Sequence, residues 1–165
     1  MLKIAVTGPE SSGKTTLANA LSKHFKVSVI PEYARSYLEN KEGKYAQKDL
    51  DLIAKGQFNS IRVPKNNIAI CDTDFIVLEI WSQYKYANVS RLITGFANKN
   101  LFDLHILCSP DIPWEEDVLR ETPDSRMHLF TLYKEALNKY NKNYIVVSGL
   151  HENRMKKSLE AIDKL

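Results

Sequence analysis

The sequence lacks several features that mark special classes of protein. No apolar stretch among its 165 residues approaches the roughly 20 residues that a membrane span needs, so a membrane partner is not expected. There are only two cysteines, Cys71 and Cys108, and both fall at the ends of predicted strands. We expect them to be reduced and buried, because an isolated pair of this kind is seldom a disulfide. The four histidines show no metal-ligand spacing, and we expect them at surface or edge positions.

A strong charge of either sign is also missing. The 23 lysines and arginines exceed the 20 aspartates and glutamates by three, which gives a net charge of +3. Nucleic-acid binding is therefore not predicted, although a mild positive balance suits an anionic nucleotide. A predicted strand begins at Leu2, which leaves no room for a signal peptide and favours a cytoplasmic protein. The sequence does not determine whether the protein forms a homo-oligomer.

The chain does contain a regular alternation of two patterns. Apolar runs of strand length recur at 2–6, 27–30, 68–71, 104–108 and 144–147, and apolar stripes of helical spacing separate them. Strands that are apolar throughout and alternate with helices predict a parallel sheet covered by helices on both faces. The length suits one domain. We therefore expect residues 1–165 to form a single α/β domain with about five strands.

Glycine is scarce, with six residues, yet two of them frame the most informative motif. Residues 8–15 read GPESSGKT, a full match to the GxxxxGK[ST] phosphate loop of P-loop NTPases, and they follow a predicted strand. In this motif the backbone N–H groups cradle a polyphosphate, the lysine reaches the β and γ phosphates, and the hydroxyl ligates Mg²⁺. We expect ATP and Mg²⁺ as cofactors. The residues predicted to bind the nucleotide are Glu10, Ser11, Ser12, Gly13, Lys14, Thr15 and Thr16, with Lys14 also catalytic and Thr15 on the metal.

Two carboxylates follow the predicted strand at 68–71. Because ligands gather at the carboxyl ends of parallel strands, Asp72 is the candidate second ligand for Mg²⁺ and a contact of the acceptor. Asp74 has two interpretations, which are compatible with each other. It is the N-cap of the helix that begins at Phe75, or it touches the substrate and takes part in catalysis.

A third carboxylate, Glu32, follows the predicted strand at 27–30. At this strand end it would lie near the γ-phosphate and accept a proton from an attacking hydroxyl. Tyr33 offers a stacking face for the substrate, and Arg35 offers a bidentate clamp for its oxygens. The alternative is a helix started by Pro31, with Glu32 in its first turn and Arg35 on the surface.

A mobile lid is predicted at about 110–127, after the predicted strand at 104–108. Arg120 and Arg126 lie on or beside it and would neutralise charge on the transferred phosphoryl group while the closed lid excludes water. The alternative is a surface loop with solvated charges. Trp114 is either a core residue or a stacking platform for the substrate, and Gly149 would let the backbone approach the purine base.

Through segments 8–16, 31–35, 72–75, 111–114 and 119–120, the chain resembles the NadR-type ribosylnicotinamide kinases, a group of P-loop kinases. The resemblance spans nearly the whole chain. It implies transfer of the γ-phosphoryl group of ATP to the 5′-hydroxyl of nicotinamide riboside. The product would be nicotinamide mononucleotide, an intermediate of NAD biosynthesis.

Three functions remain open on the sequence. The first is the Mg·ATP-dependent kinase of a small nucleoside, nicotinamide riboside above all. The second is a kinase of a deoxynucleoside or of a nucleoside monophosphate; the latter acceptor needs extra basic residues, such as Arg35 and Arg62 converging near Asp74. The third is a regulatory ATPase that binds a protein partner and transfers phosphate only to water.

Overall fold

The protein is built around one parallel sheet of four strands. The computed structural model describes residues 1–62, 66–116 and 123–165. The strand order is β2–β1–β3–β4, and all neighbours are parallel. The bounds are β1 (Leu2–Thr7), β2 (Ile68–Asp72), β3 (Leu104–Cys108) and β4 (Tyr144–Val147). Four of the predicted strands are thereby confirmed, as is the α/β class.

The fifth predicted strand, at 27–30, is wrong. Only Ile30 pairs with the sheet, through an isolated bridge to Cys71 beside the outer edge of β2. Its amide donates to the Ile70 carbonyl and its carbonyl accepts from the Asp72 amide, each at 2.8 Å. The preceding helix ends with Lys26 in a left-handed conformation, and the next helix begins at Tyr33. The Val27 amide donates back to the Ser22 carbonyl of the preceding helix at 2.9 Å, so the start of the run closes the helix, and Ile30 is the residue that reaches the edge of β2.

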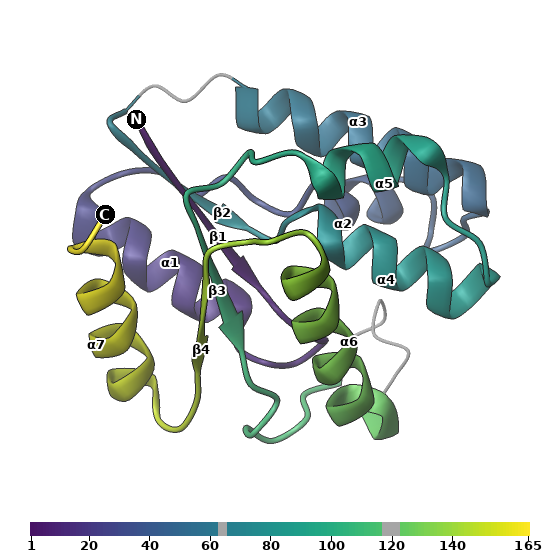
Figure 1. Ribbon diagram of the computed structural model, residues 1–165. Coiled ribbons are helices and arrows are strands. Elements are labelled where there is room, and N and C mark those ends of the chain that lie inside the picture. Colours follow the sequence, from purple (N-terminus) through teal and green to yellow (C-terminus); the bar gives the residue numbers. More distant parts are fainter. Residues whose placement is uncertain (63–65, 117–122) are drawn as a thin grey trace.

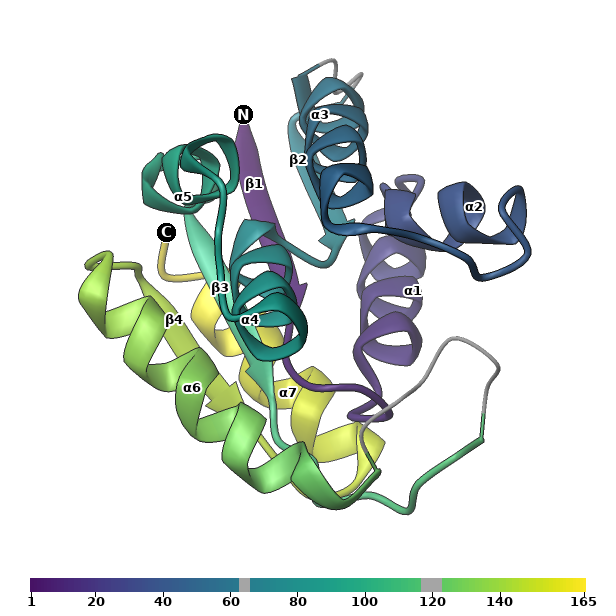
Figure 2. The same ribbon diagram turned by 90° about the vertical axis from the view of Figure 1, so that its right-hand side faces the viewer.

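Helices cover both faces of the sheet (Figure 1). On one face lie α1 and α7, and on the other lie α4, α5 and α6, with α2 and α3 beyond the β2 side. Figure 2 looks onto this second face and shows α6 and α3 on either side of α4. The helices are α1 (Lys14–Phe25), α2 (Tyr33–Glu39), α3 (Gln47–Arg62), α4 (Phe75–Tyr86), α5 (Arg91–Asn98), α6 (Arg126–Lys139) and α7 (His151–Ile162), with a short 3₁₀ turn η1 (Pro123–Ser125).

Each face of the sheet has its own apolar core. Ile4, Val6, Leu17 and Leu21 are fully buried in the core under α1 and α7. The second core is larger, because the central helix α4 is surrounded by other helices. It includes Phe75, which packs in a ring cluster with Phe96 and Phe58. Burial of apolar side chains on both faces explains why the strands are apolar throughout.

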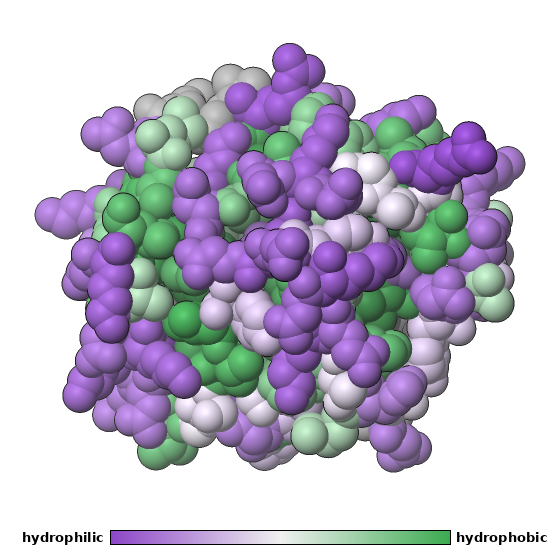
Figure 3. Space-filling model, viewed as in Figure 1, coloured by the Kyte–Doolittle hydropathy of each residue, from purple (hydrophilic) through white to green (hydrophobic). Residues whose placement is uncertain are grey.

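The two cysteines are free and buried, as predicted. Polar side chains dominate the face in Figure 3, with apolar side chains scattered between them. Within residues 1–62, 66–116 and 123–165, no helix has the length and apolar character that a membrane crossing requires.

Candidate active site

The phosphate loop joins β1 to α1 at the carboxyl end of the central strand. Its two glycines are required by geometry. Gly8 has φ of 139°, and a Cβ there would lie 2.7 Å from the carbonyl oxygen of Cys108. Gly13 has φ of 80° and is the N-cap residue of α1. The predicted strand–loop–helix context of the motif is confirmed.

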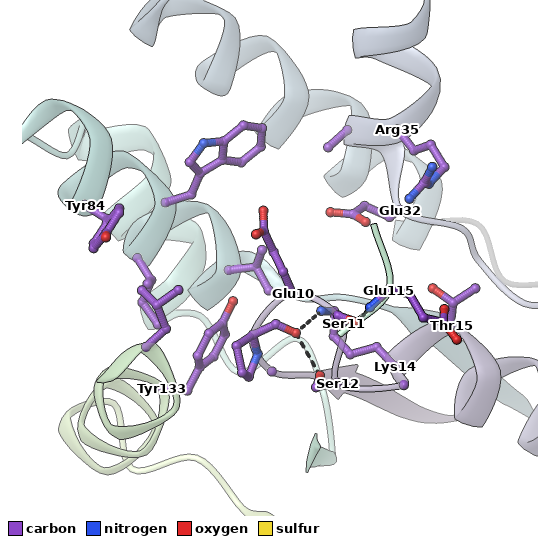
Figure 4. Close-up of a pocket in the computed structure, with 18 of the residues that line it drawn as sticks. Glu10, Ser11, Ser12, Lys14, Thr15, Glu32, Arg35, Tyr84, Glu115 and Tyr133 are labelled. Atoms are coloured by element: carbon purple, nitrogen blue, oxygen red, sulfur yellow. Dashed lines mark hydrogen bonds between the residues drawn. The ribbon is translucent and has the colours of Figure 1, made fainter. Parts of the chain in front are cut away.

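Side chains of the loop are tied to its own backbone. The Lys14 Nζ and the Ser12 Oγ both donate to the Pro9 carbonyl, at 2.7 and 2.8 Å (Figure 4). Ser11 has φ of 50°, and its Oγ accepts a hydrogen bond from the Glu115 amide at 2.9 Å. The loop is therefore stabilised from within and by the segment that follows β3.

Thr15 and Asp72 lie together, as the motif predicted. The Thr15 hydroxyl donates to Asp72 Oδ2 at 2.7 Å. The other carboxylate oxygen, Oδ1, is buried and has no hydrogen-bond partner among the residues that the structure describes. Hydroxyl and carboxylate oxygens are the ligands that Mg²⁺ prefers, so the two side chains fit this ion. In the described part of the chain no group of three or more His, Cys, Asp or Glu could hold a metal, so phosphate oxygens and water would have to complete the shell.

One cavity of about 390 Å³ extends from the phosphate loop to a wall of apolar and aromatic side chains. It lies between the loop, α2, α4 and α6, and carboxylates of Glu10 and Glu32 point into it (Figure 4). The loop residues that line it are Gly8 to Thr16. The remaining lining residues are Glu32, Ala34, Arg35, Leu38, Tyr45, Val77, Ile80, Trp81, Tyr84, Lys85, Ile112, Glu115, Leu129 and Tyr133.

A helix does follow Pro31, but α2 begins at Tyr33, so Glu32 is its N-cap residue and does not lie in its first turn. The Glu32 side chain lines the cavity. Burial raises the pKa of Glu32, and the nearby Asp72 and Glu10 act in the same direction, while Lys14 and Arg35 act against it. Arg35 is exposed but also lines the cavity. A carboxylate of raised pKa beside the phosphate loop is suited to accept a proton.

Tyr33 faces another helix and does not line the cavity. Its amide donates to Gln57 Oε1 at 2.7 Å. Its ring packs against Gly56 of α3, where an added Cβ would lie 2.2 Å from a ring carbon. These contacts anchor the start of α2 on α3, so Tyr33 supports the position of Glu32 next to it.

Asp74 caps helix α4. Its Oδ1 accepts from the Val77 amide at 3.1 Å and from the Thr7 hydroxyl at 3.0 Å. The side chain is buried and does not line the main cavity, so the structure supports the cap and leaves a substrate contact as a prediction. Its Oδ2 lies 3.7 Å from Nε2 of His105. The surface or edge position expected for His105 is wrong: this residue is 3% exposed, and burial lowers its pKa.

The residues predicted on the lid are partly described. Arg120 lies outside the described residues. Arg126 donates to the carbonyls of Ser11 and Ile112, at 3.1 and 2.9 Å, and its guanidinium lies 5.6 Å from the Trp114 ring centroid. Neither Trp114 nor Arg126 is among the residues that line the cavity. Their catalytic and binding roles stay predictions.

Gly149 lies in the turn between β4 and α7, with φ of 77°. Its amide donates to Asp111 Oδ2 at 2.6 Å, and the residue does not line the cavity. Contact with a purine base therefore stays a prediction too.

Sequence reasoning missed most of the aromatic wall. The site residues predicted from the sequence do not include Trp81, Tyr84 or Tyr45. The Tyr45 hydroxyl accepts from Trp81 Nε1 at 2.9 Å and from Lys85 Nζ at 2.5 Å. Tyr133 of α6 completes this side of the cavity.

Comparisons with known proteins bear on this site. Residues 3–154 match the model of the AAA domain family. The chain is 29% identical, over 98% of its length, to the trifunctional NAD biosynthesis/regulator protein NadR of Salmonella typhimurium, of which it covers 42%. It is 31% identical over 87% of its length to the NadR protein of Escherichia coli, covering 37%. The chain thus spans less than half the length of these relatives, and the predicted resemblance to NadR is confirmed.

Solved structures share the fold. A NadR protein in complex with NAD and AMP-PNP superposes with a TM-score of 0.81 at 21% identity, covering 99% of this chain and 49% of that one. Deoxyadenosine kinase from M. mycoides with bound dATP superposes with a TM-score of 0.62 at 17% identity, covering 99% of this chain and all of that one. The P-loop NTPase fold that the motif predicted is confirmed.

Proposed function

The chain belongs to the AAA domain family, and on this premise we propose that it is an ATP- and Mg²⁺-dependent nucleoside kinase whose acceptor is nicotinamide riboside. The observation that carries the proposal is a single cavity. It is lined by the phosphate loop, by an aromatic wall and by the Glu32 carboxylate. The similarity to NadR over nearly the whole chain supports the acceptor.

The phosphate loop is the donor half of the site. Loop amides and the Lys14 amine would bind the phosphates of ATP, and Thr15 with Asp72 would hold Mg²⁺. When bound, the ion would neutralise charge on the phosphate oxygens. Positioning and charge compensation of this kind account for most of the catalysis of phosphoryl transfer.

Glu32 acts on the acceptor. Its carboxylate accepts the proton of the 5′-hydroxyl as that oxygen forms a bond to the γ-phosphorus, while the bond to the leaving oxygen of ADP breaks. The raised pKa of Glu32 makes it a stronger base than a solvated carboxylate. Asp74 is the other candidate base, but its buried carboxylate is engaged in capping α4.

The aromatic wall suits a cationic ring. Nicotinamide riboside carries a positive charge on its pyridinium ring, and aromatic faces attract cations. The carboxylates of Glu10 and Glu32, which point into the same cavity, favour a positive charge there.

A nucleoside monophosphate fits the cavity less well. That acceptor needs additional cations for its own phosphate, and the predicted pair was Arg35 and Arg62. Arg35 lines the cavity, whereas Arg62 ends α3 with its guanidinium 5.8 Å from the Phe58 ring centroid. The two do not converge there.

The proposal is tested by incubating the purified protein with Mg·ATP and, separately, nicotinamide riboside, deoxyadenosine and AMP. We expect ADP formation that depends on nicotinamide riboside, with nicotinamide mononucleotide identified by mass spectrometry. Lys14→Ala serves as the control for a contaminating kinase, because loss of its charge should lower turnover by about 10²-fold or more. If no nucleoside stimulates ADP formation and a protein partner does, the regulatory ATPase is the correct function.

A further inference from the structure

A buried arginine outside the cavity contacts the phosphate loop from behind. Arg154 lies in α7, and only 4% of its side chain is exposed. Its Nη1 donates to the Ser12 carbonyl at 2.7 Å, and its Nε donates to the Gly149 carbonyl at 2.9 Å. Its Nη2 donates to the Ser109 carbonyl at 3.0 Å and also to Asp111 Oδ1.

These partners follow three different strands. Ser12 lies in the loop after β1, Ser109 and Asp111 follow β3, and Gly149 follows β4. Asp111 adds a second link, because its other oxygen accepts from the Gly149 amide at 2.6 Å. One guanidinium therefore joins the phosphate loop to the two neighbouring segments at the carboxyl edge of the sheet. A planar fork with five N–H donors can make such a junction, and a lysine amine cannot.

The bond to Ser12 also determines where the next amide points. In a trans peptide the C=O and the N–H point in opposite directions. Since the Ser12 carbonyl faces Arg154, the Gly13 amide of the same peptide faces away from it. Arg154 does not line the cavity whereas Ser12 and Gly13 do, so this amide is directed toward the side where phosphates would bind.

We propose that Arg154 is a positioning residue for the nucleotide: by holding the Ser12 carbonyl, it presents the loop amides to the polyphosphate. The inference rests on the proposed function, since it assumes that the loop binds ATP. A residue that only stabilises α7 would affect the stability of the protein alone. Loss of the Arg154 guanidinium should instead weaken the binding of ATP and leave the acceptor site unaffected.

The test compares Arg154→Lys and Asp111→Asn with a matched control, Lys142→Met. Lys142 is also a buried cation that donates to backbone carbonyls, those of Asn98 and Lys99, at 3.1 and 2.8 Å. It precedes β4, at the opposite edge of the sheet from the phosphate loop. The Asp111 side chain is 37% exposed, so its substitution should preserve the fold even if Arg154→Lys does not.

Calorimetry measures the binding of Mg·ATP, and steady-state kinetics measures KM for each substrate. We expect Arg154→Lys to weaken ATP binding about tenfold or more, and Asp111→Asn to weaken it by a smaller factor. KM for nicotinamide riboside should stay within about twofold, and Lys142→Met should lower the melting temperature without weakening ATP binding. Wild-type ATP affinity in both Arg154→Lys and Asp111→Asn would overturn the inference. A wild-type protein that binds ATP but phosphorylates no nucleoside would instead overturn the proposed function.

Discussion

Glu32 links the pH of the solution to the proposed reaction. A base must be ionised to accept a proton, and burial raises the pKa of this carboxylate. We therefore predict that kcat rises with pH through a pKa above that of a solvated glutamate. Glu32→Gln should lower kcat by about 10²–10⁴-fold and remove this limb of the profile. The measurement is the pH dependence of kcat in both proteins. If Glu32→Gln keeps turnover while Asp74→Asn abolishes it, Asp74 is the base.

The same carboxylate should destabilise the fold when it is ionised. A pKa that is higher in the folded than in the unfolded state gives stability that is present at low pH and lost as the pH rises through the folded value. Glu32→Gln removes the charge, so it should raise the melting temperature at pH 8 and change it little at pH 4. Thermal melts at both pH values check this. An equal change at both would show that charge is not the cause.

The start of α2 depends on the surface of α3. Gly56 in the middle of α3 leaves room for the ring of Tyr33, which an added Cβ would approach to 2.2 Å. Alanine favours a helix over glycine by about 1 kcal/mol. We nevertheless predict that Gly56→Ala lowers both the melting temperature and kcat, because it displaces Tyr33 and hence Glu32. A matched control is Gly95→Ala in α5, where a Cβ would meet none of the described atoms within 4 Å. Loss of activity in both variants, or in neither, would contradict the prediction.

The segment between α2 and α3 carries Tyr45 and is held by Asp49. This buried carboxylate accepts from the Ala46 amide at 2.8 Å, from Lys41 at 2.6 Å and from the Tyr37 hydroxyl at 2.7 Å. These hydrogen bonds, with that of the Ala46 amide the largest contribution, hold the pKa of Asp49 well below its usual range. The network thus stabilises the loop that places Tyr45 against Trp81.

Asp49→Asn should loosen this loop and raise KM for the acceptor, while KM for ATP stays unchanged. A folded pKa below the unfolded one gives stability that is present above the unfolded value and lost as the pH falls. The variant should therefore melt well below the wild type at pH 7 and by a smaller margin at pH 3, where the unfolded chain is already mostly protonated but the folded carboxylate is not. The measurements are melting curves at the two pH values and KM for each of the two substrates. An equal rise of both KM values would mean that the loop does not act on the acceptor alone.

At the level of the whole fold, the sequence predicts those elements correctly whose pattern lies within one short segment. Apolar runs predict β1, β2, β3 and β4, and the spacing of residues 8–15 predicts the phosphate loop together with its strand and helix. The apolar run at 27–30 was wrongly predicted as a strand, because an apolar pattern does not show whether a segment can pair along the edge of the sheet. Here Ile30, between α1 and α2, pairs with β2.

The acceptor side was unpredictable for a different reason. Its aromatic residues come from three places, with Tyr45 between α2 and α3, Trp81 in α4 and Tyr133 in α6. A helical stripe shows that a side chain is covered, but not which distant segment covers it. Arg154 was missed likewise, because its partners follow three different strands.

Binding of Mg·ATP should raise the melting temperature of the whole protein. Asp72 should determine which part of this rise requires Mg²⁺. A ligand that binds only the folded state adds about 2.7 kcal/mol at a concentration of 100 Kd. For a chain of this size that corresponds to a rise of about 5–10 °C in Tm. EDTA should reduce the rise in the wild type, because the Asp72–Thr15 oxygens would lose the ion.

Asp72→Asn separates the metal from the nucleotide. Among the described residues the buried Oδ1 of Asp72 has no hydrogen-bond partner, so its replacement breaks no hydrogen bond within that part of the protein, and the variant without ligand should melt close to the wild-type temperature. Its ATP-induced rise in Tm should be smaller than that of the wild type and the same with Mg²⁺ as with EDTA. Lys14→Ala is the control, since it should lose most of the rise under both conditions. If Asp72→Asn kept the full Mg²⁺-dependent rise in Tm, the metal would have to bind through ligands other than the Asp72 carboxylate.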